Sequence, residues 1–184
     1  VILVFQNRIR VIKQRQENER LGFKNRLLFL EQQSLNASMN RHFIFNSLNS
    51  IQYFINSSDK RSANKYLSSF AKLIRKNLDS STANNFIVTL QEEVDRIELY
   101  LTLEKMRFQE KFDYELNVSS SIDTEGIEIP SMILQPFVEN SIIHGVLPLE
   151  RKGHISINIF EEFGDIVFEV VDDGVGIDNT LNNK

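Results

Sequence analysis

Residues 129–145 read IPSMILQPFVENSIIHG, and residues 170–177 read VVDDGVGI. The first stretch has helical spacing, and we expect Pro130 to open the helix in its first turn and Gly145 to end it. The second stretch continues an apolar run that is typical of a strand, and its glycines indicate a loop. Together they predict a helix and a strand-to-loop junction in the last third of the chain.

The helix-breaking residues are unevenly distributed along the chain. All three prolines and six of the seven glycines lie within residues 126–184, so the first 125 residues hold one glycine and no proline. This predicts a long helical region followed by strands and turns. We expect helices over residues 1–57 and 60–78, joined by a turn in which Ser58 or Asp59 caps the second helix. The second helix has an apolar stripe at three-to-four spacing: Ala63, Leu67, Phe70, Ala71, Ile74 and Leu78.

A polar linker over residues 79–85 separates this hairpin from the rest, which predicts domains at 1–80 and 81–184. A third helix is expected from Thr89, which forms a capping box with Glu92, to about Gln109. Alternation predicts the following strands: 112–118, 154–161 and 165–171, the last two joined by a turn at Gly164. The predicted fold class is therefore α+β.

Composition excludes several kinds of function. The net charge is −4 and like charges form no long block, so we expect no nucleic-acid partner. The absence of cysteine excludes disulfides, thiolate zinc sites and cysteine nucleophiles. The apolar residues 1–5, followed at once by basic residues, fit either the end of a membrane span that precedes residue 1 or the start of a buried helix.

Three groups of residues could carry chemistry. His42, on the first helix, offers a neutral imidazole that is nucleophilic near pH 7, although a single histidine is more often a surface or core residue. Asn140 and His144 share a helix face, where an amide oxygen can bind Mg²⁺ or simply form a polar helix edge. Asp172 at a strand end could accept a hydrogen bond from an exocyclic amine, or belong to an acidic turn.

The order of these segments resembles the LytS-type sensor histidine kinases, whose ATP-binding half has the Bergerat (GHKL) fold. Four stretches carry the resemblance: MNRHFIFNSLNSIQ (39–52), LQEEVDRIELYLTLEKMRF (90–108), IPSMILQPFVENSIIHG (129–145) and VVDDGVGI (170–177). The resemblance implies a long helical hairpin that dimerises into a four-helix bundle, followed by a partial Bergerat-type α/β sandwich. It also implies ATP and Mg²⁺ as cofactors.

The resemblance implies a role for each candidate residue. His42 would accept the phosphoryl group, and Asn46, one turn on, is our candidate for orienting it. Asn140 would hold Mg²⁺, with Glu139 and His144 on the phosphate side. Asp172 would bind the adenine amine, with Gly174 and Gly176 shaping the pocket around the base.

The implied activity is autophosphorylation followed by transfer to the receiver domain of a response regulator. The implied setting is the cytoplasmic part of a bacterial inner-membrane protein that forms homodimers. Three departures favour an alternative, a catalytically impaired dimerisation or scaffold module: Arg41 before the histidine, Ile143 in place of a lysine, and no second glycine-rich box before Lys184. On this ground we expect the 184-residue chain to bind ATP weakly.

Overall fold

The computed structural model describes residues 17, 20, 43–82 and 87–176. The chain divides into two compact units, Val1–Asn49 and Ser50–Lys184. Most of the predicted first helix lies outside the described residues, but residues 43–56 are helical as expected. The domain boundary near residue 80 stays a prediction.

A tight turn leads from this helix into α2 (Lys60–Thr82). The backbone N–H of Ser62 donates to Oδ1 of Asp59 at 3.0 Å, so Asp59 is the cap and the capping prediction is confirmed. The helix continues to Thr82, beyond the expected end at residue 78 and through half of the predicted linker. The Phe54 ring contacts the Tyr66 ring at 5.8 Å between centroids, which joins the two arms of the hairpin.

The buried stripe of α2 differs from the predicted one. Tyr66 and Leu73 are fully buried, with Ala63 and Asn77 beside them on the same face, whereas Leu67 is 49% exposed. The face that packs is therefore rotated by about one residue from the most apolar face. A helix buries the side that its neighbour covers, and here that neighbour is α3.

The capping box predicted for the third helix is confirmed in α3 (Leu90–Arg107). The Glu92 N–H donates to Oγ1 of Thr89 at 3.2 Å, and the Thr89 N–H donates back to Oε2 of Glu92 at 3.0 Å. The helix ends at Arg107, two residues before the expected end. The predicted start is therefore set by local chemistry alone.

Three strands form a mixed sheet in the order β2 (Phe112–Val118), β4 (Gly153–Glu162), β5 (Asp165–Asp172). The predicted strands are confirmed with shifts of one residue at their ends. β2 and β4 are parallel, with Phe112 opposite Gly153, and β4 and β5 form an antiparallel hairpin. The turn at Phe163 and Gly164 has positive φ at both residues, 53° and 88°, which is the backbone that a tight hairpin requires.

Two short strands were not predicted. β1 (Ile87–Thr89) and β3 (Glu128–Pro130) pair antiparallel, with Ile87 opposite Pro130. The prediction that Pro130 opens a helix is therefore wrong. The helix α4 (Gln135–Asn140) begins five residues later with Pro136 in its first turn, and continues as the π-helix η1 (Ser141–Val146).

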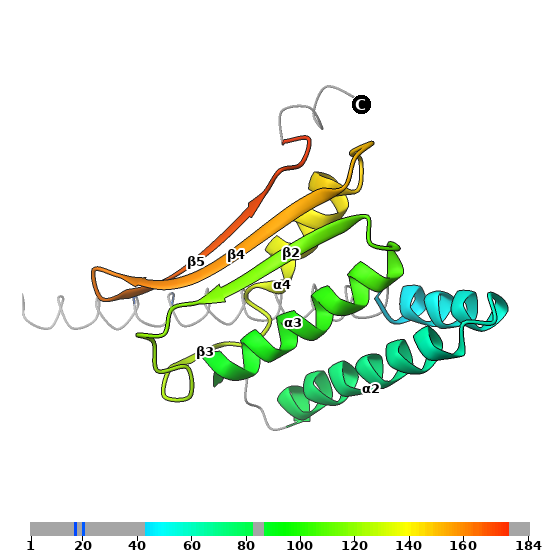
Figure 1. Cartoon of the computed structure of the whole chain (residues 1–184). Coiled ribbons are helices and arrows are strands. Elements are labelled where there is room, and N and C mark those ends of the chain that lie inside the picture. The colour runs from blue at the N-terminus through cyan, green and yellow to red at the C-terminus, as the bar shows by residue number, and fades with distance from the viewer. Residues whose placement is uncertain (1–16, 18–19, 21–42, 83–86, 177–184) are drawn as a thin grey trace, which may run out of the picture. The chain divides into compact units, whose positions relative to one another are not determined.

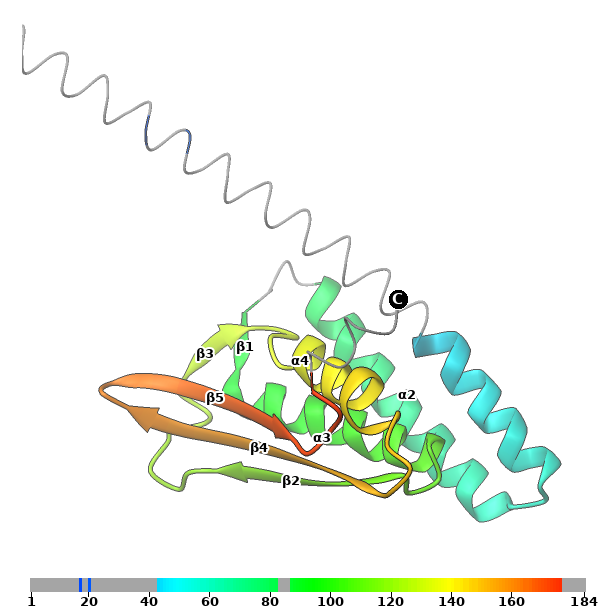
Figure 2. The ribbon, with the colours of Figure 1, turned by 90° about the horizontal axis from the view of Figure 1, so that it is seen from above.

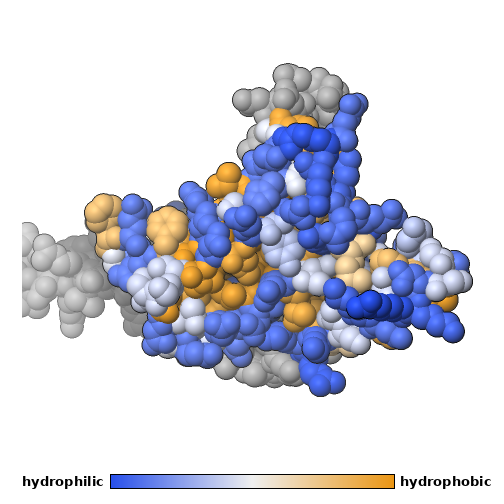
Figure 3. Space-filling model, in the orientation of Figure 1, coloured by the Kyte–Doolittle hydropathy of each residue, from blue (hydrophilic) through white to orange (hydrophobic). Residues whose placement is uncertain are grey.

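Figures 1 and 2 show α3 and α4 on one face of the three-stranded sheet, with α2 on the other side of α3. β4 alternates buried and half-buried residues, and its buried side chains face these helices. The core combines helix and strand residues: Leu90, Ile97, Leu101, Phe112, Leu134, Val138, Ile142, Ile155, Ile157 and Ile159. On the face drawn in Figure 3, apolar residues gather toward the middle and polar residues surround them.

The structure confirms the α+β class, while the dimeric bundle and the Bergerat-type sandwich stay predictions. Within the described ranges, every helix is too short or too polar to cross a bilayer.

Candidate functional site

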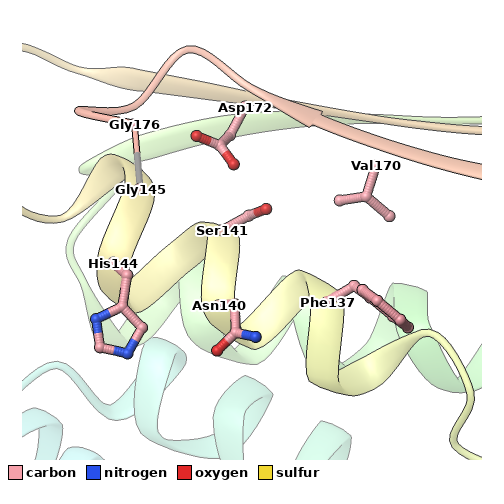
Figure 4. A pocket seen from close by; sticks show the side chains of 8 residues that line it. All are labelled: Phe137, Asn140, Ser141, His144, Gly145, Val170, Asp172 and Gly176. Carbon is pink, nitrogen blue, oxygen red and sulfur yellow. The ribbon is translucent and has the colours of Figure 1, made fainter. Parts of the chain in front are cut away.

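A cavity of about 470 Å³ lies between η1 and the end of β5. Asn140 and His144 line it from the helix side, and Asp172 and Gly176 line it from the strand side (Figure 4). Sequence spacing placed the first pair on one helix face, and the structure adds the strand end opposite. Four of the predicted residues therefore line one cavity, whose size is within the usual range of small-molecule sites.

Two glycines allow the helix and the loop after β5 to meet. A Cβ on Gly174 would lie 2.4 Å from the backbone carbon atoms of Gly145, and a Cβ on Gly145 would lie 2.6 Å from Oδ1 of Asp172. The Val175 N–H also donates to the Gly145 carbonyl at 3.1 Å. Gly174 is thus placed beside the cavity, where it lets two backbones touch and keeps the Asp172 carboxylate directly over the helix.

The loop is also fixed on its outer side by Asp173. Its Oδ1 accepts from the His154 N–H at 2.7 Å, and its carboxylate forms an ion pair with Arg151. Its backbone carbonyl accepts a second bond from Arg151 at 2.8 Å. Asp172 and Asp173 therefore have separate tasks, because one faces the cavity while its neighbour binds the start of β4.

Glu139 is not among the residues that line the cavity. Its charge acts instead on Glu104 of α3, a side chain that is 2% exposed and accepts hydrogen bonds from Arg107 at 3.0 and 3.3 Å. Burial raises the pKa of Glu104 to about 7 against the opposing effect of Arg107, and Glu139 adds to the rise. Burial and these two carboxylates also raise the pKa of Tyr100 well above its ordinary value. The buried side chains of Glu104 and Tyr100, together with Glu139, thus form a titratable cluster.

This cluster predicts a pH dependence of stability. Between pH 4.5 and about 7 the folded chain keeps the Glu104 proton that the unfolded chain has released, so the free energy of unfolding should fall as the pH rises. The slope contributed by this group approaches about 1.4 kcal/mol per pH unit. Glu104→Gln, which resembles the protonated form, should gain stability relative to the native chain over that range.

Urea unfolding at a series of pH values measures the effect. Glu98→Gln, on the exposed side of the same helix, is the matched control and should give a curve parallel to the native one. A Glu104→Gln curve that is equally parallel would contradict the assignment.

Four lining residues were not among the predicted site residues: Phe137, Ser141, Gly145 and Val170. The helical period could have found the first two, because Phe137 lies three residues before Asn140 and Ser141 lies three residues before His144. Val170 is two residues before Asp172 in a strand and shares its face. His42 lies outside the described residues, and Asn46 lies in the helix at 43–56 within the first compact unit.

The known proteins that this chain resembles are histidine kinases and sensor proteins. The family model described as histidine kinase matches residues 30–112. The chain is 30% identical to the sensor histidine kinase YesM of Bacillus subtilis over 151 residues, 82% of this chain and 25% of YesM. It is 32% identical to the sensor histidine kinase BtsS of Escherichia coli over 151 residues, 81% of this chain and 25% of BtsS.

A third relative, the sensor protein LytS of Bacillus cereus, is 30% identical over 148 residues, 80% of this chain and 24% of LytS. The chain thus spans about a quarter of the length of the curated relatives it matches. On these grounds the chain belongs to the histidine kinase family, in the LytS/YesM type.

Proposed function

We propose that this chain is the core of a two-component sensor kinase, in which His42 accepts the γ-phosphoryl group of ATP and passes it to a response regulator. The observation that carries the proposal is the cavity, which is lined by Asn140 and His144 of one helix and by Asp172 and Gly176 at a strand end. Glycines at 145 and 174 allow the helix and the loop after β5 to lie in close contact beside the cavity. The donor set therefore fits a nucleotide.

Each residue would contribute one interaction. The Asp172 carboxylate accepts from the exocyclic amine of adenine, because a carboxylate is an acceptor only. The Asn140 amide oxygen is a hard ligand, and Mg²⁺ needs few protein ligands when phosphates supply the others. Bound Mg²⁺ would neutralise charge on the phosphates. His144, one turn further along the helix face, would contact the phosphate side.

His42 would supply the nucleophile. One neutral ring nitrogen attacks the γ-phosphorus as the bond to the β–γ bridging oxygen breaks, so ADP leaves with that electron pair. Asn46 is four residues after His42 in the sequence and is our candidate for forming a hydrogen bond with the other ring nitrogen. The resulting phosphoimidazole is acid-labile, and transfer to a receiver aspartate regenerates His42.

A homodimer and a membrane tether complete the proposal. Apolar side chains on the helical hairpin support dimerisation, because Tyr53, Ile55 and Leu67 are 51%, 62% and 49% exposed. The relatives are named sensor kinases or sensor proteins, which supports a response regulator as the partner. The tether, a span before residue 1 that anchors a cytoplasmic core, is supported by the apolar residues 1–5 and the basic residues that follow them.

Labelling of the full-length protein with γ-³²P-ATP tests the proposal. We expect Mg²⁺-dependent, acid-labile labelling, and Asp172→Ala should weaken ATP binding by about ten- to a hundredfold because a charged hydrogen bond is lost. Asp165→Ala, at the opposite end of β5, is the matched control. ATP binding without any label would favour the impaired scaffold module instead, and failure to bind ATP would overturn the proposal.

A further inference from the structure

Ser141 occupies an unusual place in the cavity wall. It is the first residue of η1, is 8% exposed, and lines the cavity. Figure 4 shows its hydroxyl on the side of the helix where the Asp172 and Val170 side chains lie. A hydroxyl that borders a ligand-sized cavity can form a hydrogen bond with a molecule bound there.

The glycines around these two side chains allow the Asp172 carboxylate to lie close to the helix that carries Ser141. Gly145 is four residues after Ser141, and a Cβ there would lie 2.6 Å from Oδ1 of Asp172. That same oxygen accepts from the Gly174 N–H at 3.1 Å, so the loop already engages one side of the carboxylate. The carboxylate is therefore held in place with acceptor capacity left for a ligand.

The two side chains have complementary chemistry. A carboxylate only accepts hydrogen bonds, whereas a hydroxyl can also donate. Adenine has an amine that donates next to ring nitrogens that accept, whereas guanine has a carbonyl oxygen in place of that amine. A carboxylate beside a hydroxyl donor thus matches the amine and the neighbouring ring nitrogen of adenine. With guanine in the same position, the carboxylate would lie opposite the carbonyl oxygen, which is also an acceptor.

We infer that Ser141 is a specificity-determining residue for the base, donating its hydroxyl proton to a ring nitrogen next to the amine that Asp172 accepts. This inference rests on the proposed nucleotide site. On this inference Ser141 contacts the ligand directly, and the preference for adenine over guanine depends on Ser141 and Asp172 together.

Equilibrium displacement of a fluorescent ATP analogue from the full-length protein tests the pair. Ser141→Ala should weaken ATP binding about tenfold and change GTP binding much less, so the ATP-to-GTP preference falls about tenfold. Ser141→Thr keeps the hydroxyl and should keep the preference. Ser156→Ala, on the sheet face away from the cavity, is the matched control and should bind like the native protein.

Analogues that lack one ring nitrogen give a second measurement. The loss caused by Ser141→Ala should disappear with either 1-deaza-ATP or 7-deaza-ATP, whichever removes the acceptor. An equal loss with ATP and both analogues would overturn the inference, as would an unchanged ATP-to-GTP preference. If Asp172→Ala still weakens ATP binding in those cases, the nucleotide site stands and only the role of Ser141 fails. A native protein that binds no ATP would overturn both.

Discussion

His42→Gln is expected to abolish acid-labile phosphorylation of the full-length protein completely while ATP affinity stays within about twofold. Glutamine has no ring nitrogen, so it cannot form the N–P bond that the proposed phosphorylation requires. The residues that line the described cavity come from 137–145 and 170–176, so nucleotide binding should not depend on position 42. Labelling and nucleotide displacement on the same preparation measure the two quantities separately.

The other two histidines of the chain sharpen this experiment. His144→Gln should weaken ATP binding, because that side chain lines the cavity. His154→Gln should change neither quantity, because its contact with Asp173 is made by the backbone N–H. Label that survives His42→Gln, or that is lost only in His154→Gln, would assign the acceptor to another residue.

Glu93→Ala should lower the free energy of unfolding by about 3–5 kcal/mol, the largest stability loss that we expect from one substitution. The Glu93 carboxylate is 1% exposed and accepts from the N–H groups of Met132 and Leu134 at 2.9 and 3.2 Å. It also pairs with Arg96, which is 3% exposed. Its removal leaves the two amides without this acceptor and takes the Glu93 ion pair from the buried Arg96, and Met132, at φ 61°, loses the bond that holds it.

Urea unfolding measures this loss, and the neighbouring residue gives the control. Glu92→Ala removes only the exposed half of the capping box, so it should cost about 1 kcal/mol. Equal losses for the two variants would show that the buried carboxylate does not anchor the segment before α4. Glu93→Gln, which keeps the shape but not the charge, should fall between them.

The sequence predicted best where a few adjacent residues decide the structure. The capping box of α3 and the turn at Gly164 depend on side chains within four positions, and both are confirmed. The start of α4 depends on distant contacts. Pro130 and Pro136 are both suitable helix starts, but the hydrogen bonds from Met132 and Leu134 to Glu93 keep the segment between them out of the helix.

The same distinction applies to the site. Helical spacing placed Asn140 and His144 on one helix face, but whether they line the same cavity as Asp172 depends on how the helix packs on the sheet. Glu139 acts on Glu104 of α3, whereas its neighbour Asn140 lines the cavity, so the two adjacent residues have different surroundings. The side of a helix that faces a partner is a tertiary property, which also explains why Tyr66 rather than Leu67 is buried in α2.

The parallel pairing of β2 with β4 has a consequence for the order of folding. β4 and β5 can close as a local hairpin, whereas Phe112 reaches Gly153 only after about 40 intervening residues have been looped. Those residues include α4 and η1, which form the helix wall of the cavity. We therefore expect Asp172 to reach its native position early, when the hairpin of β4 and β5 forms. Asn140, Ser141 and His144 should reach theirs later, when the connection between β2 and β4 closes. The site is assembled by the last long-range step, so a kinetic probe of ligand binding would report completion of the domain.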